Sequence, residues 1–223
     1  MLGRCTPPDP PQLATLASCA LAGALGALPG AAGALDPVTV LGWMALCAPA
    51  AGAACGARGI ALLPGALVPA TWMLQLAWVQ SGAERGFATL GWAGCALSGL
   101  FALGLALGRR ARSALPTAGA LLFLGLVLSS AALGFGLVAG GAELARSHPH
   151  LAARLLDASP LVLVFDCAGW DWVHAQPEVY ADAGVEWLQR RAYRGNLAGP
   201  AVLVVGCLLA ILARRPHHLA RVR

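Results

Sequence analysis

Long runs of apolar residues fill most of this chain, and they constrain its fold more than any other feature. Hydrophobic residues make up 58% of the 223 residues, whereas charged residues make up only 11%. Soluble domains average roughly 25% charged residues, so this chain has too few charges to cover a globule in water. The lipid bilayer is therefore the solvent that suits the chain, and the composition predicts an integral membrane protein.

Six of the apolar runs approach or exceed the length of about 20 residues that a helix needs to cross the hydrocarbon core. Pro64 and Pro69 interrupt the third run, which predicts a kinked helix packed inside the bundle. We therefore predict an all-α polytopic protein with a single membrane domain over residues 1–223 and about six transmembrane helices. The predicted spans are residues 13–35, 38–55, 60–79, 87–108, 114–140 and 197–213.

The distribution of arginines favours one orientation of these spans. With both termini in the cytoplasm, nine of the fifteen arginines lie on the inner side, as the positive-inside rule requires. The chain is then a multi-pass protein of a bacterial inner (plasma) membrane. Its net charge of +5 follows from this topology, so no nucleic-acid partner is expected.

A cluster of basic residues follows the fourth predicted span. Arg109, Arg110 and Arg112 would lie on the cytoplasmic side of the membrane. Positive-inside anchoring accounts for them without any partner. Contact with an acidic ATPase surface or with anionic lipid headgroups is the alternative interpretation.

The polar residues gather in the outer loop, residues 145–196, between the fifth and sixth predicted spans. Leu151, Leu155 and Leu156 share a helical face, which predicts a short amphipathic helix that stops at Ser159-Pro160. The apolar segment that follows this break is too short to cross the membrane. The pattern predicts cap helices that dip toward the outer rim without spanning it.

We expect this cap to cover residues 151–180, with Leu155, Leu163 and Phe165 buried against the bundle. A tryptophan pair around a carboxylate either seals the outer mouth or anchors the loop at the interface. The other predicted cap residues are Pro160, Asp166, Trp170, Asp171, Trp172 and His174.

Two patterns of chemically active residue types have simpler explanations. His148, His150 and His174, together with Asp166 and Cys167, are metal-ligating residue types. Solvated or helix-capping roles explain them better, so we expect no metal and no cofactor.

Ser98 lies in "GCALSGLFALG", which invites comparison with a serine nucleophile in a membrane protease. Such a serine needs a general base within hydrogen-bond reach, and no predicted span contains a histidine. Ser98 and Gly99 are better explained as a helix-packing pair, and we predict that the chain is not an enzyme.

Two segments of the second half resemble the permease subunits of type-2 ABC exporters. "HPHLAARLLDASPLVLVFDCAG" is similar to the "P-x-x-L…L…nPL" pattern that precedes the last span in this family. "LGLALGRRARSALPTAGALLFL" is similar to the cytoplasmic turn between its fourth and fifth spans. Together they fall within residues 98–213. The resemblance implies a transport permease that works with a separate ATPase subunit and a second permease copy.

The first half departs from that family, which leaves a second function open. Twelve residues precede the first predicted span, and the inner turn near Arg58 is only a few residues long, so the expected interface and coupling helices are missing. The alternative is a non-catalytic structural membrane subunit of a larger complex, with other membrane subunits as partners besides the lipid bilayer.

Overall fold

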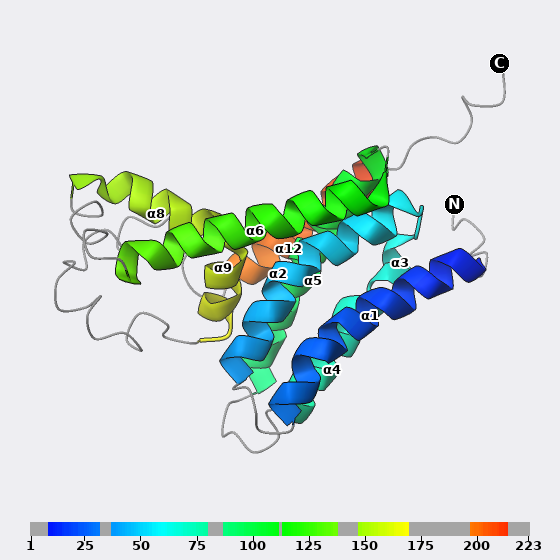
Figure 1. Ribbon diagram of the computed structural model, residues 1–223, viewed down its shortest axis with the longest axis horizontal. Helices are drawn as coiled ribbons and strands as arrows, with labels where there is room; N and C mark the ends of the chain where they lie inside the picture. Colours follow the sequence, from blue (N-terminus) through cyan, green and yellow to red (C-terminus); the bar gives the residue numbers. More distant parts are fainter. Residues whose placement is uncertain are drawn as a thin grey trace.

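A computed structural model describes residues 9–31, 37–79, 87–111, 113–137, 147–169 and 197–213 (Figure 1). Within these ranges the chain is helical and contains no strand, as the sequence predicts. The helices are α1 (Pro10–Ala31), α2 (Pro37–Ala57), α3 (Leu62–Gly65), α4 (Leu67–Val79), α5 (Phe87–Arg110), α6 (Ala114–Leu137), α8 (Pro149–Ala158), α9 (Pro160–Cys167) and α12 (Ala198–Leu212).

Each of the six predicted spans falls on one of these helices or, for the third, on the pair α3 and α4. Three stretches are long and apolar enough to cross a membrane, namely Thr39–Ala57, Leu90–Arg110 and Ala114–Ala131. Their length and hydropathy confirm that the chain has the character of a membrane protein. The number of spans and their orientation remain predictions.

The third predicted span is broken rather than merely bent. Helix α3 ends at Gly65, Ala66 forms a turn, and α4 begins at Leu67. Pro69 has no amide hydrogen, so it cannot donate to the carbonyl of Gly65 one turn earlier. The backbone N–H of Ala66 instead reaches back to the carbonyl oxygens of Leu62 and Leu63, at 2.9 and 3.2 Å. The two prolines thus divide one apolar run into two helices.

Helix α5 lies at the centre of the bundle and packs against α2 at van der Waals contact between backbones. A Cβ atom added to Gly52 would lie 2.0 Å from the carbonyl oxygen of Phe101, and one added to Gly56 would lie 2.2 Å from that of Leu105. The relation is reciprocal. Cβ atoms on Gly104 and Gly108 would lie 2.0 and 2.1 Å from the carbonyl oxygens of Pro49 and Ala53. Only glycine fits at these four positions.

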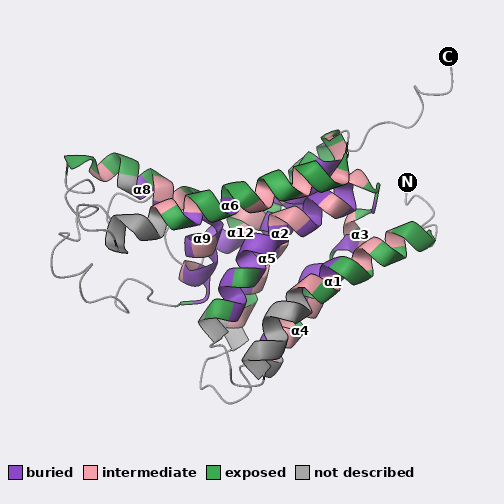
Figure 2. Cartoon of the chain, in the orientation of Figure 1, coloured by how far each residue is buried: buried purple, intermediate pink, exposed green. Residues whose placement is uncertain are grey.

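Helix α12 packs against another part of α5 in the same manner. A Cβ atom on Gly99 would lie 2.6 Å from the backbone nitrogen of Leu203, and one on Gly206 would lie 2.6 Å from the carbonyl oxygen of Gly99. Small residues allow such close approach in membranes, where helices associate through packing because lipid is as apolar as their side chains. Figure 2 shows the resulting core, in which buried residues concentrate on α2, α5 and α9.

Helix α1 is fastened to the bundle by side chains that donate to backbone carbonyls. The indole nitrogen of Trp43 on α2 donates to Ala22 at 3.0 Å, and that of Trp72 on α4 donates to Cys19 at 3.2 Å. The thiol sulfurs of Cys19 and Cys55 lie 3.9 Å apart where α1 meets α2. Helices α1 and α4 consequently run side by side in Figure 1.

Helix α6 is the least buried of the three candidate spans. In its candidate span only 11% of the residues are buried, against 72% in that of α2. Leu115 and Phe123 are among its exposed side chains. It touches the bundle along one edge, where Gly125 approaches Leu46 and Pro160. A helix that exposes this much apolar surface requires lipid or another apolar partner around it.

The glycine contacts between α2 and α5 predict that an added methyl group lowers the stability of the protein at a contact position but not at an open one. Gly104→Ala should destabilise the protein by roughly 1–3 kcal/mol, because the new methyl group collides with the backbone of Pro49. Gly119→Ala on α6 has open space around its Cβ position and should be neutral or stabilising by up to about 1 kcal/mol. Thermal unfolding of both variants in the same detergent would measure the difference. Equal stability of the two variants would contradict the close packing.

Candidate functional site

The segment that joins α8 to α9 shows why one helix ends and the next begins at the predicted point. Ser159 has an extended backbone, with ψ of 120°, as is usual for a residue before proline. Its hydroxyl oxygen accepts a hydrogen bond from the backbone N–H of Val162 at 3.3 Å and so caps α9. Pro160 occupies the first helical turn, where its missing N–H does no harm. The sequence Ser-Pro therefore ends one helix and starts the next.

The same serine joins this segment to α6. The hydroxyl groups of Ser159 and Ser129 lie 3.2 Å apart, and both side chains are buried. A buried hydroxyl without a partner would lose its hydrogen bonding to water, so the pair satisfies both groups. This contact gives α8 and α9 a defined place beside α6.

The burial of the predicted cap residues is now defined for those that the structure describes. Leu163 and Phe165 are buried, together with Pro160, whereas Leu155 is only half-buried. Asp166 is half-buried as well. The predicted residues Trp170, Asp171, Trp172 and His174 lie outside the described residues.

The three leucines of the predicted helical face differ in burial. Leu156 is buried and Leu155 is half-buried, whereas Leu151 is 51% exposed, and Ala153 is also buried on α8. The spacing of three residues between Ala153 and Leu156 is equally helical, and the small Ala153 lets α8 approach its neighbours closely. Arg154 is exposed.

The residue types that suggested a metal do not form a metal site in the described part of the chain. No group of three potential ligands comes together there. His148 and His150 are exposed at the start of α8. Burial raises the pKa of the Cys167 thiol to about 11, although the backbone N–H of Gly199 acts in the opposite direction. This thiol is therefore protonated at neutral pH and is a poor ligand or nucleophile.

Arg109 joins three segments at one end of the bundle. Its guanidinium donates to the carbonyl oxygen of Ile60, at 3.0 Å, and to that of Ala210. Ala210 lies in the last turn of α12, where carbonyl groups lack helical partners and the helix dipole favours a cation. Arg110 is exposed beside it, and Arg112 lies outside the described residues.

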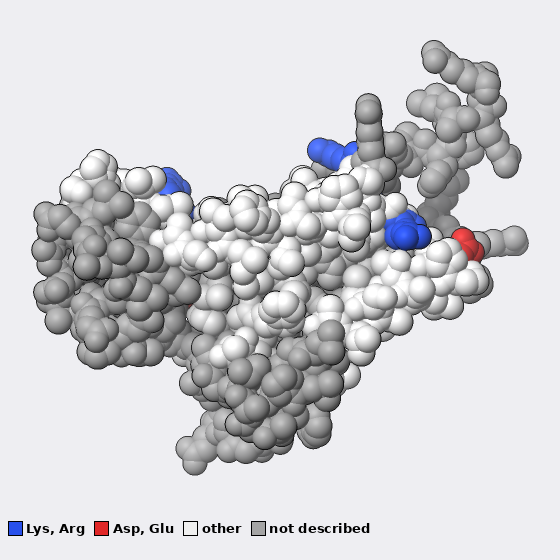
Figure 3. All heavy atoms as spheres, in the orientation of Figure 1, with Lys and Arg blue, Asp and Glu red and all other residues white. Residues whose placement is uncertain are grey.

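A further contact joins two other helix ends at this same end of the molecule. The side-chain amide of Gln12, near the start of α1, donates to the carbonyl oxygen of Arg58 at the end of α2. In Figure 3 the described charged side chains lie toward the ends of the molecule, with an uncharged surface between them. The arginine end, defined here by Arg58, Arg109 and Arg110, is thus separated from the uncharged flank of the helices.

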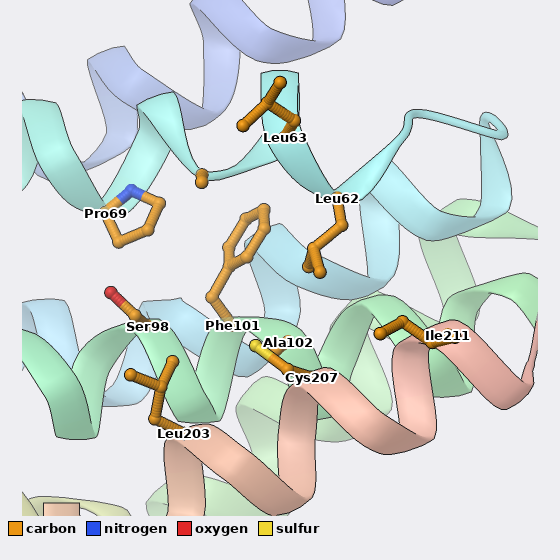
Figure 4. Close-up of a pocket in the computed structure, with 10 residues that line it drawn as sticks. Leu62, Leu63, Pro69, Ser98, Phe101, Ala102, Leu203, Cys207 and Ile211 are labelled. Carbon is orange, nitrogen blue, oxygen red and sulfur yellow. The ribbon is translucent and has the colours of Figure 1, made fainter. Parts of the chain in front are cut away.

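An apolar pocket of about 450 Å³ lies between the broken helix α3–α4, α5 and α12 (Figure 4). Such a volume falls in the range of about 300–1,000 Å³ typical of small-molecule sites. The ring of Phe101 projects from α5 toward α3 and α4, close to Gly65. On α12, Leu203, Cys207 and Ile211 recur every four residues and so face the pocket together.

The polarity of the pocket limits what it can bind. Ser98 carries the single side-chain oxygen among the lining residues, and Figure 4 shows it pointing toward Pro69. The rim is apolar and open, since Leu63 is 75% exposed and Ile211 is 50% exposed. Hydrocarbon fits such a lining, whereas a charged or sugar-like ligand would find almost no hydrogen-bond partners.

Sequence reasoning did not identify this pocket, although its strongest signal was available. The two prolines in the third apolar run predicted an irregular helix, and a discontinuous membrane helix is a common element of binding sites in transporters. Ser98, whose motif invites comparison with a serine nucleophile, lies at the pocket wall, while its neighbour Gly99 packs against α12.

Comparisons with protein-family models, with curated proteins and with solved structures gave no match.

The bonds of Arg109 predict a larger effect at this residue than at its neighbour. Arg109→Gln should lower the free energy of unfolding by about 1.5–3 kcal/mol, because it removes charged donors from two backbone carbonyls. Arg110→Gln changes an exposed residue and should stay within about 0.5 kcal/mol of the parent. Thermal unfolding in detergent compares the two. A stability loss at Arg110 as large as that at Arg109 would show that charge alone matters.

Proposed function

We propose that the chain is a multi-pass protein of the bacterial inner membrane that crosses the bilayer six times, with both termini in the cytoplasm. In such a topology the start of the first span, the turn between the second and third, the end of the fourth and the end of the sixth share one side. The hydrogen bonds of Gln12 and Arg109 support this arrangement, because they join these same points. The arginines at that end support its assignment to the cytoplasm.

Accessibility labelling of two exposed positions tests this topology. His150→Cys on α8 should react with a membrane-impermeant maleimide added outside intact inner-membrane spheroplasts. Arg110→Cys should react only after the membrane is opened. The native cysteines of the parent protein provide the background. Reaction of Arg110→Cys from outside would reverse the orientation. Reaction of both positions from the same side would contradict the crossing that we propose between them.

We further propose that the chain is a transport permease for apolar molecules, driven by a separate ATPase subunit and working as a pair. The observation that carries this proposal is the pocket at the break between α3 and α4, because transporters use discontinuous helices to build substrate sites. These 223 residues contain no phosphate-binding loop, and the proposal assigns nucleotide hydrolysis to a separate ATPase subunit. Arg110 and the neighbouring Arg112 are candidates for the contact with it.

Isolation of the intact membrane complex in a mild detergent tests the permease proposal. An ATPase chain should copurify with the tagged protein, and its ATP hydrolysis should change when the pocket is filled by the variant Ala66→Phe. Ala120→Phe on the exposed surface of α6 is the matched control. A complex with no ATPase chain would refute the permease role.

A non-catalytic structural subunit is the second candidate, and two observations favour it. The backbones of α2 and α12 touch that of α5 at several glycines and leave no space for a substrate at those positions. The exposed apolar surface of α6 could accommodate another membrane protein. A complex that contains other membrane chains along α6 but no ATPase would support this role over transport.

A further inference from the structure

The pocket and the arginine end lie along one face of α5. Ser98, Phe101 and Ala102 line the pocket, and Arg109 follows on the same helical face two to three turns further along. On α12 the lining residue Ile211 is next to Ala210, whose carbonyl oxygen accepts from Arg109. On α3 the lining residue Leu62 is two positions from Ile60, the other acceptor. The pocket therefore extends from the arginine end into the apolar part of the bundle.

The depth of the pocket matches one leaflet of a bilayer. At about 1.5 Å per residue, Ser98 and Arg109 are about 16 Å apart along the axis of α5. One leaflet of the hydrocarbon core is about 15 Å deep, which is half of the roughly 30 Å of the whole core. A lipid chain whose headgroup lies at the level of Arg109 would thus reach the level of Ser98.

The chemistry along this path changes from basic to apolar in the order of a phospholipid. Arg58 and Arg110 are exposed at the arginine end. Below them the lining is aliphatic and aromatic as far as the hydroxyl of Ser98, and the exposed side chains of Leu63 and Ile211 open it toward the surrounding lipid. Water in this pocket would lack hydrogen-bond partners, whereas an acyl chain would bury apolar surface on both sides.

We propose that this pocket binds one acyl chain of an anionic phospholipid from the cytoplasmic leaflet, with its headgroup at the arginine end. The site is a fixed lipid site between α3, α5 and α12. It rests on the membrane location of the chain and not on transport, so it holds for the permease and for the structural subunit alike.

Photolabelling in nanodiscs of phosphatidylcholine tests the site on the purified chain, without any ATPase. The probe is phosphatidylglycerol with a diazirine in the middle of one acyl chain, and the comparison is phosphatidylcholine with the same chain. Mass spectrometry of the peptides should find the phosphatidylglycerol adducts concentrated on residues 62–69 and 203–211. Labelling there should be several-fold stronger with phosphatidylglycerol than with phosphatidylcholine, while the exposed surface of α6 is labelled equally by both.

Variants separate the chain site from the headgroup site. Ala66→Phe places a ring at the exposed mouth of the pocket and should reduce labelling of residues 203–211 several-fold. Cys207→Phe tests the opposite wall, and Ala120→Phe on α6 should have no effect. Arg58→Gln combined with Arg110→Gln should remove most of the preference for phosphatidylglycerol, because each basic residue near an anionic surface contributes a factor of about five.

Three results would overturn the proposal. The first is adducts that follow lipid exposure alone, without enrichment at residues 62–69 and 203–211. The second is labelling like that of the parent in both pocket variants, when these elute as folded protein in size-exclusion chromatography. Equal labelling by phosphatidylglycerol and phosphatidylcholine at the pocket would exclude an anionic headgroup. Loss of the ATPase interaction would leave all of these readouts unchanged. A failure of the permease proposal can therefore be distinguished from a failure of the lipid-site proposal.

Discussion

The backbone contact between α2 and α5 is the constraint on which the rest of the structure depends. Four glycines in two pairs, each pair one turn apart, bring the helices so close that a methyl group would overlap a carbonyl oxygen. Within a bilayer such contact provides what the hydrophobic effect cannot, since apolar side chains gain little by leaving lipid. Pro49 lies at this crossing, and its carbonyl oxygen faces Gly104. The position of α5 then determines where α12, α9 and the pocket can lie.

Polar groups complete the packing at helix ends and where one helix touches another. Arg109 donates to carbonyl groups of two other segments, and Ser159 pairs with Ser129 while it caps α9. Indole nitrogens of Trp43 and Trp72 fasten α1 to its neighbours. Each of these donors serves a backbone carbonyl or a buried hydroxyl, which is the general requirement in a medium without water. The bundle thus has few polar residues, and those named here lie at helix ends or at contacts between helices.

The pocket results from a conflict between two local preferences in the third apolar run. Its composition favours a continuous span, whereas Pro64 and Pro69 favour a break, and the compromise is a turn at Ala66 between two shorter helices. The displaced backbone leaves a volume that Phe101 and the facing residues of α12 fill only in part. A binding site on this protein is therefore tied to an irregular segment, while the tightly packed α2–α5 contact has no free volume at its glycines.

The sequence by itself determined the solvent and the class of this protein. The scarcity of charge and the length of the apolar runs favoured a helical membrane protein, and each predicted span overlaps a helix or, for the third, the pair α3 and α4. Ser159-Pro160 also defined a helix boundary, because proline restricts the residue before it and lacks an amide hydrogen. These features act within a few residues, so they can be read without knowing the fold. The burial of Phe165 followed from the same local pattern.

Only the tertiary structure decided which of many similar residues matter. The chain has 28 glycines, and nothing local distinguishes Gly104, which touches Pro49, from Gly119, which touches nothing. Arg109 and Arg110 are adjacent and chemically identical, but one donates to distant carbonyls and the other is exposed. The half-buried state of Leu155 and the exposure of Leu151 likewise depend on what lies opposite α8. Contacts between residues far apart in sequence arise from how helices cross, and crossing depends on the shapes of both surfaces at once.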